Sequence, residues 1–225
     1  MGTIKRLQIA YSGTLEAYGA PKHKWLKRLL GLFWTYKNNR IDASTRSAFY
    51  LIQAVAILKT RFGIHPEELN IHLWGSIDDK HRQWCKIYAV ESYFTISGFE
   101  NKVDSMNRLQ SADLLFLPLE RSTIKGERTL FIPGKLYDYF KLRKPILALC
   151  EDSDCKDLIV ASGLGFCFEP DQPEQIAQGL FPIIKNPLLL LALKPNTEVL
   201  DNCNYTERTR QLASVFDTLN NESRT

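Results

Sequence analysis

Strand-like and helix-like segments alternate along almost the whole of this chain. The clearest strand is DLLFLP, residues 113–118, which is apolar at nearly every position and ends at a proline. Such a run is typical of a strand buried on both faces, and strands of this kind belong to parallel sheets covered by helices. This segment therefore constrains the fold more than any other.

The other segments follow the same order. Short apolar runs predict strands over residues 7–11, 70–76, 93–99, 145–149 and 165–170. Helical periodicity and capping residues predict helices over residues 47–63, 78–91, 101–112, 155–163 and 205–219, and two more that begin near Lys135 and at Pro173. Six alternations predict an α/β fold, a doubly wound Rossmann-like parallel sheet with helices on both faces.

Length and cysteine usage indicate a single domain in a reducing compartment. No linker divides the 225 residues, so we expect one domain over residues 1–225. The cysteines at positions 85, 150, 155, 167 and 203 are never spaced as C-x-x-C, which argues against a disulfide framework and a zinc site. Because the four histidines make no metal-ligand pattern either, we expect no metal.

Charge and hydropathy exclude two further classes of protein. The net charge of +4 is small and no nucleic-acid-binding signature is present, so no nucleic-acid partner is expected. No run approaches the roughly 18 apolar residues of a membrane span. We expect a cytoplasmic protein, and peripheral contact with the inner face of the membrane stays open.

Small or turn-forming residues occur where the expected strands end. The strand over residues 7–11 is expected to stop at Ser12-Gly13, and the next strand ends at Gly75-Ser76. Gly98, Pro118 and Cys150 follow later strands. Because ligands of doubly wound sheets bind outside the carboxyl ends of the strands, this edge, which we call the rim, is the expected site.

A Pro-Gly-Lys turn precedes one of the expected helices. Pro133-Gly134 leads directly into the helix at Lys135, so the unpaired amides of its first turn favour an anion, and Lys135 adds a full positive charge. Asp138 lies about one turn further on the same face. Together they suit a nucleotide, with the diphosphate at the helix start and the ribose hydroxyls donating to Asp138; an ordinary solvated Lys135–Asp138 ion pair is the alternative.

The stretch FIPGKLYDYFKLRKPILAL, residues 131–149, resembles the sugar-nucleotide-binding half of GT-B glycosyltransferases of the family 4, or group 1, type. Their segment reads P-S-K-hydrophobic-aromatic-E-Y followed by P-I-L-A. IAYSGTL and IHLWGS resemble the first two Gly loops of that half, and FTISGFENKVDSMNRLQSADLLFLPLE and DLIVASGLGFCFEPDQPEQIAQGL resemble its later blocks. The resemblance covers nearly the whole chain.

The resemblance implies a role for matching positions. Lys135 would act on the donor diphosphate as the catalytic cation, and Asp138 would bind the ribose. The remaining donor-binding positions would be Gly13, Thr14, Gly75, Ser76, Gly98, Phe99, Pro133, Gly134 and Leu136. The implied donor is a UDP- or GDP-sugar, with no cofactor and no metal.

Two departures from the family pattern affect the expected sugar and phosphate contacts. The Arg and Lys that follow the first Gly in the family are here Thr14 and Gly19, and the first acid of the E-x7-E pair is Leu130. Nearby loop residues are candidate substitutes, namely Lys22, Lys24, Arg121, Lys125 and Glu127.

The resemblance also implies that this chain is one half of an enzyme. GT-B enzymes pair two Rossmann-like domains, so we expect a missing N-terminal half or partner subunit that supplies the site for a glycan or lipid-linked acceptor. A basic amphipathic insertion over residues 20–42 carries six Lys or Arg and no acid between residues 21 and 40. This pattern predicts either that the insertion packs in the core or on the missing half, which we favour, or that it contacts a membrane surface.

Three functions are compatible with these patterns. The favoured one is the donor-binding domain of a retaining, metal-independent glycosyltransferase that acts on a polysaccharide or a lipid-linked acceptor. The second is a non-catalytic nucleotide-sugar-binding module that docks onto a partner transferase half. The third is a doubly wound domain with an unrelated ligand, because this architecture serves many functions.

Overall fold

A computed structural model describes residues 6–16, 41–124 and 126–222 of the chain. Most of the expected basic insertion, residues 20–40, lies outside these residues, as do the candidate substitutes Lys22, Lys24 and Lys125. The last two residues of that insertion, Ile41 and Asp42, form a short strand, β2.

One parallel sheet organises the described part of the chain. Its strands are β1 (Leu7–Leu15), β3 (Leu69–Ile77), β4 (Phe94–Ser97), β5 (Leu114–Pro118), β7 (Ile146–Leu149) and β8 (Gly165–Phe168). Their order across the sheet is β4-β3-β1-β5-β7-β8. The chain thus moves outward from β1 in one direction and then from β5 in the other, which is the strand order of the doubly wound Rossmann fold. The expected fold class is confirmed.

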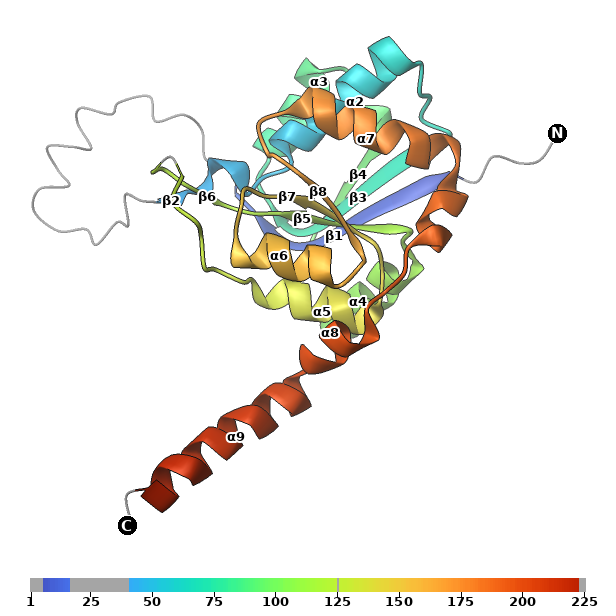
Figure 1. Cartoon of the computed structure of the whole chain (residues 1–225). Helices are drawn as coiled ribbons and strands as arrows, with labels where there is room; N and C mark the ends of the chain where they lie inside the picture. The colour runs from blue at the N-terminus through green and yellow to red at the C-terminus, as the bar shows by residue number, and fades with distance from the viewer. Residues whose placement is uncertain (1–5, 17–40, 125, 223–225) are drawn as a thin grey trace, which may run out of the picture.

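Helices cover both faces of the sheet (Figure 1). One face is covered by α2 (Phe49–Phe62), α3 (Lys80–Ile87) and α7 (Pro173–Lys185). The other is covered by α4 (Lys102–Ser111), α5 (Gly134–Leu142), α6 (Asp154–Ala161) and α8 (Thr197–Asn202). The last helix, α9 (Tyr205–Glu222), extends away from this body.

The central strand β5 is buried on both faces, as its sequence predicts. Leu114 and Phe116 join the core beneath α2 and α7, while Leu115 and Leu117 join the core beneath α4 and α5. Alternating side chains of a strand point to opposite faces, so an all-apolar strand can fill two cores at once.

The first two strands continue further than we expected. β1 runs through Gly13 to Leu15 and β3 runs through Gly75 to Ile77, so the prediction that Ser12-Gly13 stops the first strand is wrong. Gly13 pairs with Gly75 in the parallel register. A Cβ on Gly75 would lie 2.3 Å from the carbonyl oxygen of Gly13. The two glycines therefore permit close strand pairing instead of ending it.

Most of the predicted helices lie where the sequence placed them. α2 ends at Gly63, which adopts the left-handed conformation of a helix C-cap. The backbone N–H of Lys80 donates to the Asp78 carboxylate at the start of α3. The C-terminal helix was expected over residues 205–219 and continues to Glu222. The short helix α8 was not predicted.

A buried histidine fixes the start of α2. His81 is fully buried; its Nδ1 donates to the Asp78 carbonyl at 2.9 Å, and its Nε2 accepts the N–H of Ala48 at 3.2 Å. Burial lowers the pKa of His81 below its ordinary value, an effect that the Asp78 carbonyl partly opposes. The folded protein therefore holds this imidazole in its neutral form.

We predict that His81 makes the stability of the fold depend on pH. Its pKa is lower in the folded state than in the unfolded state, so the stabilisation is complete above pH of about 6.5 and declines as the pH falls below that value. Urea titrations between pH 7 and pH 5 should show a smaller loss of unfolding free energy for His81→Gln than for the parent chain. The exposed His65→Gln is the control, and equal pH slopes in all three proteins would contradict the prediction.

The five cysteines are free thiols. None of the helices in the described residues combines the length and the hydrophobicity that crossing a bilayer requires.

Candidate functional site

The strand order reverses between β1 and β5, and ligands of doubly wound sheets bind at such a switch point. α5 begins at this point, and two of its side chains lock it against the sheet: Leu136 is fully buried, and the Tyr139 hydroxyl donates to the Phe116 carbonyl on β5 at 2.9 Å. Burial raises the pKa of Tyr139 well above its ordinary value, so this hydroxyl stays protonated as a donor. The N-terminus of α5 is thus held rigidly at the switch point of the sheet.

The first turn of α5 presents unpaired amides. Pro133 is the N-cap and has no side chain that can accept from the helix. The N–H of Leu136 donates to the Pro133 carbonyl at 3.0 Å. Within the described residues, the N–H groups of Gly134 and Lys135 have no acceptor, so they are available to an anion.

Lys135 crosses from α5 to the end of β1. Its ammonium donates to the Ser12 carbonyl and lies 4.7 Å from the centre of the Tyr11 ring. A Cβ on Gly13 would lie 2.6 Å from the Lys135 Nζ, and Gly13 has a φ of +136°. Gly13 therefore leaves the space that the ammonium occupies. Lys135 does not form the solvated ion pair with Asp138 that was the alternative interpretation.

Burial lowers the pKa of Lys135 to about 8; Asp138 opposes this shift and Arg46 adds to it. Burial also raises the pKa of Tyr11 to about 12, an effect that Arg46 partly offsets. A lysine with a pKa near 8 is partly neutral at physiological pH, and an approaching anion would favour its charged form. Binding of an anion beside Lys135 would therefore be coupled to protonation of this lysine.

Two hollows flank Lys135 and Asp138, which line both of them. The first hollow has a volume of about 290 Å³ and is lined by Tyr11, Arg46, Leu117, Pro118, Leu119, Glu120, Phe131, Pro133, Gly134, Lys135 and Asp138. The second has a volume of about 210 Å³ and is lined by Ser12, Phe99, Glu100, Lys102, Ser105, Met106, Leu109, Lys135, Asp138 and Tyr139.

Arg46 is a site residue that sequence reasoning missed. It follows a short 3-10 helix, Ala43–Thr45, which begins where Asp42 accepts the N–H of Ser44. The Thr45 hydroxyl donates to the Leu119 carbonyl just beyond β5 at 2.7 Å, so the segment is fastened to the rim. The Asp-Ala-Ser-Thr turn is visible in the sequence, but its attachment to a strand end 74 residues away is not.

The second hollow has an aromatic and a polar side. Phe99 is 88% exposed at its edge, whereas Met106 and Leu109 of α4 form its apolar part. Ser12 and Ser105 share a hydrogen bond of 2.5 Å, and the buried Trp74 indole donates to Ser105 at 3.0 Å. These hydrogen bonds connect α4 to β1 and β3, so they hold the α4 side of the second hollow in place.

The predicted site residues divide into two groups. The structure places Phe99, Pro133, Gly134, Lys135 and Asp138 in the lining of the two hollows, and it places Gly13 against the ammonium of Lys135. Thr14, Gly75, Ser76, Gly98 and Leu136 line neither hollow. Among these, Leu136 is fully buried and its N–H is already bonded, while Gly75 lies against the backbone of Gly13.

The candidate substitutes among the described residues have other contacts. Arg121 pairs with Asp42 at 3.1 Å and with Asp171 at 2.7 Å. Glu127 accepts the hydroxyl of Ser122 at 2.8 Å. Leu130, at the position of the family's first acid, is 74% exposed. Over the described residues, no group of three or more His, Cys, Asp or Glu is arranged to hold a metal ion.

The site combines cations, helix amides, a carboxylate and an aromatic ring. Lys135, Arg46 and the first amides of α5 together attract a doubly charged anion such as a diphosphate. Asp138 is half-buried and, when ionised, is a hydrogen-bond acceptor suited to a diol. Phe99 offers a flat apolar surface to a ring. The arrangement suits a nucleoside diphosphate.

No protein-family model and no curated protein matches the sequence. Solved structures do match the fold. HepE from Anabaena, in complex with UDP and glucose, has a TM-score of 0.60 and 13% identity over 95% of this chain and 49% of that chain. Sucrose-phosphate synthase from Thermosynechococcus elongatus has a TM-score of 0.63 and 10% identity over 97% of this chain and 46% of that chain.

The lipopolysaccharide outer core galactosyltransferase WaaB, in its apo form, has a TM-score of 0.57 and 12% identity over 95% of this chain and 50% of that chain. The chain thus spans half or less of the length of these three solved structures. Its fold is the Rossmann-like α/β fold of one half of a GT-B glycosyltransferase, as the sequence resemblance implied.

Proposed function

We propose that this chain is the donor-binding domain of a retaining, metal-independent glycosyltransferase that transfers a sugar from a nucleotide-sugar to a polysaccharide or a lipid-linked acceptor. The observation that carries this proposal is the position of Lys135. Its ammonium lies at the first turn of a helix whose amides are unpaired, at the switch point of the sheet. The GT-B fold of the chain and the UDP bound in the Anabaena HepE structure support the same reading.

In this proposal the residues stabilise the departing nucleoside diphosphate. The amides of Gly134 and Lys135 and the Lys135 ammonium take the negative charge that grows on the diphosphate as the glycosidic bond breaks. Arg46 supplies a second cation in the absence of the Arg and Lys that the family carries after its first Gly. Because protein groups balance this charge, the proposed reaction needs no metal at this site. The proposed donor is a UDP- or GDP-sugar.

The proposal assigns the nucleoside to the second hollow. Asp138 lies between the two hollows and would accept hydrogen bonds from the ribose hydroxyls. Phe99 and Gly98 would flank the base, with Phe99 able to stack on it.

A second Rossmann-like half or partner subunit completes the proposed enzyme. Apolar side chains stand exposed around the rim, with Phe99 on one side and Leu130 and Phe131 on the other. Exposed apolar groups beside a site are typical of a surface that closes against another body. The partner half would bind the acceptor, and we place the enzyme on the cytoplasmic side of the membrane.

A non-catalytic nucleotide-sugar-binding module is the second candidate function. It is favoured by Leu130, an exposed leucine where the family has an acid. Sugar transfer from the donor in the presence of the partner half distinguishes the two candidates. Turnover supports the enzyme, whereas donor binding without turnover supports the module.

We predict that Asp138→Ala weakens nucleoside diphosphate binding by about 1.5–3 kcal/mol, the scale of a hydrogen bond to a charged group. Calorimetric titration of the full chain measures this change. The fold should be unaffected because Asp138 is only half-buried at the edge of the hollows.

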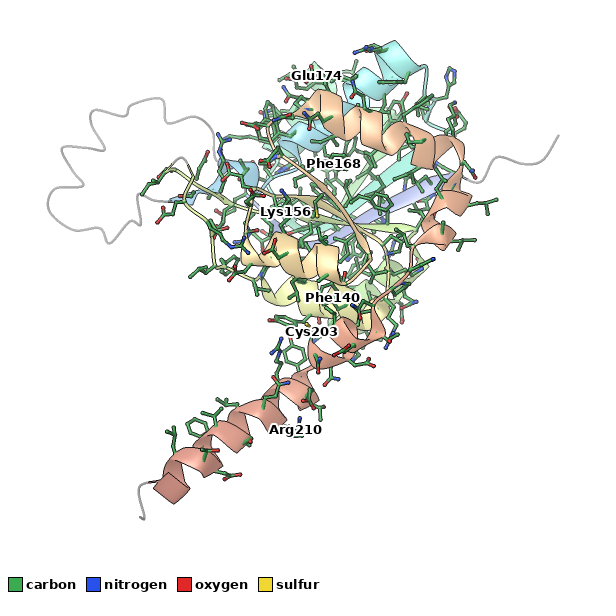
Figure 2. The ribbon with its side chains drawn as sticks, in the orientation of Figure 1. Phe140, Lys156, Phe168, Glu174, Cys203 and Arg210 are labelled. Carbon is green, nitrogen blue, oxygen red and sulfur yellow. The ribbon has the colours of Figure 1, made fainter. Side chains whose placement is uncertain are left out.

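The matched control is Glu174→Ala, which removes an exposed carboxylate at the start of α7, on the opposite face of the sheet (Figure 2). It should bind as the parent does. Equal affinity in Asp138→Ala and the parent would refute the ribose role.

A further inference from the structure

A carboxylate lies in the second hollow, next along the chain from the exposed ring of Phe99. It belongs to Glu100, which follows β4 and lines the hollow together with Lys102 at the start of α4. α4 lies beside α5 on one face of the sheet (Figure 1). The Glu100 side chain is 19% exposed, so it is enclosed on most sides. Neither the diphosphate nor the ribose, as assigned above, needs this carboxylate.

One oxygen of the Glu100 carboxylate lacks a hydrogen bond. Oε2 is buried and, among the groups of the described residues, has no hydrogen-bond donor. The Nε of Arg108 on α4 lies 2.9 Å from Oε2 and forms an ion pair with it, but the contact does not have the geometry of a hydrogen bond. Buried polar atoms are nearly always hydrogen-bonded, and leaving one unbonded costs free energy. A ligand that brings N–H donors to this carboxylate would remove that cost.

The common nucleobases differ in the donors that they can offer to a carboxylate. An ionised carboxylate only accepts hydrogen bonds, through two adjacent oxygens. The Watson–Crick edge of guanine presents two adjacent donors, N1–H and the N2 amino group. Uracil has a single N3–H between two carbonyl oxygens, and adenine and cytosine have an acceptor ring nitrogen beside the amino group. Each of these three bases therefore sets an acceptor against one of the carboxylate oxygens, which is unfavourable.

We propose that Glu100 selects guanine as the base of the donor, so that the site takes a GDP-sugar. The inference rests on the proposed function, because it requires the nucleoside to occupy the second hollow. The two oxygens of Glu100 accept from N1–H and from the N2 amino group, while Phe99 stacks on the ring. Lys102, an exposed lysine of the same hollow, donates to the O6 carbonyl on the same edge of the base.

The test is calorimetric titration of the full chain with GDP, UDP, ADP and inosine diphosphate. Inosine diphosphate differs from GDP only in lacking the N2 amino group, so it isolates one of the two proposed hydrogen bonds. We expect GDP to bind at least about tenfold more tightly than each of the other three, because a hydrogen bond to a charged group is lost or an acceptor is opposed.

Glu100→Gln should lower the affinity for GDP by about tenfold or more and abolish the preference for GDP over inosine diphosphate. The glutamine has nearly the same shape, but its amide nitrogen is a donor and would face another donor, the N2 amino group. Binding of inosine diphosphate by this variant shows that the site is still folded. The matched control is Glu198→Gln, which neutralises an exposed carboxylate on α8 outside both hollows and should bind as the parent does.

The outcomes separate this inference from the proposed function on which it rests. If UDP, ADP or inosine diphosphate binds as tightly as GDP, or if Glu100→Gln keeps the preference for GDP, the guanine assignment is wrong and the donor site still stands. If no diphosphate binds, the donor site itself is wrong, and the guanine assignment fails with it.

Discussion

Replacing Lys135 by alanine should weaken binding of a nucleoside diphosphate by about 2–3 kcal/mol, or roughly 30- to 150-fold. The ammonium is the mostly buried cation at the start of α5, and it already donates to a carbonyl at the end of β1. A diphosphate at this point would exchange a neutral acceptor for a charged one, which strengthens the hydrogen bond. Isothermal titration calorimetry of the folded variant measures the loss.

The same lysine should make binding depend on pH. Burial holds its pKa at about 8 in the free protein, and a bound diphosphate would raise this value. Affinity should therefore be highest below pH 8 and fall as the pH rises above it, because binding then requires uptake of a proton. In Lys135→Ala this part of the pH dependence should disappear.

The control is Lys141→Ala, which removes an exposed lysine from the last turn of the same helix, away from both hollows. Lys141→Ala changes the net charge as much as Lys135→Ala does, yet it should bind the nucleotide as the parent does. The comparison therefore distinguishes the loss of the Lys135 contact from a general loss of positive charge. If Lys135→Ala and Lys141→Ala lose the same small amount of affinity, Lys135 has no specific role in the site.

Replacing Gly75 by alanine should destabilise the fold by roughly 2–5 kcal/mol, from overpacking and backbone strain together. Gly75 has a φ of +117°, and a Cβ there would lie 2.3 Å from the carbonyl oxygen and 3.0 Å from the carbonyl carbon of Gly13. Both atoms belong to the backbone of a paired strand, so they cannot move aside without disturbing β1. Chemical denaturation measures the loss.

Gly98→Ala is a closely matched control. Gly98 follows the neighbouring strand β4 and accepts a hydrogen bond from the N–H of Gly75, yet a Cβ there would meet nothing within 4 Å. The variant should retain the parent's stability within about 1 kcal/mol. Equal stability of Gly75→Ala and Gly98→Ala would show that β1 and β3 do not require the close approach seen between Gly13 and Gly75.

The sequence predicted those parts of the fold that depend on local pattern. The apolar run of β5, the Gly63 cap of α2 and the Pro-Gly start of α5 each carry their signal within a few residues. The alternation of strand and helix segments along the chain was sufficient to predict a parallel, doubly wound sheet. The position of Lys135 on the rim also follows, because a helix start after a strand end must lie at that edge.

Other features depend on contacts between distant segments and could not be read from local pattern. In the sequence alone, Gly13 could mark the end of a strand, because a single glycine can indicate either a turn or a close approach of two backbones. Only its pairing with Gly75 in the sheet shows that it serves the second purpose. Arg46 reaches the rim only because Thr45 bonds to a strand end far along the chain. Thr14 and Gly19 were visible in the sequence as departures from the GT-B pattern, and loop residues were named as candidate substitutes, but Arg46, which lines the first hollow, was not among them.

The most direct test of the proposed donor site is a calorimetric titration of the unmodified chain with UDP, GDP, ADP and CMP, and with the matching nucleosides. We predict that one diphosphate binds and that its nucleoside binds far more weakly, because the helix start, Lys135 and Arg46 recognise the phosphates. Absence of binding by every diphosphate, or equal binding of a diphosphate and its nucleoside, would contradict the assignment of this rim as a nucleotide-sugar site.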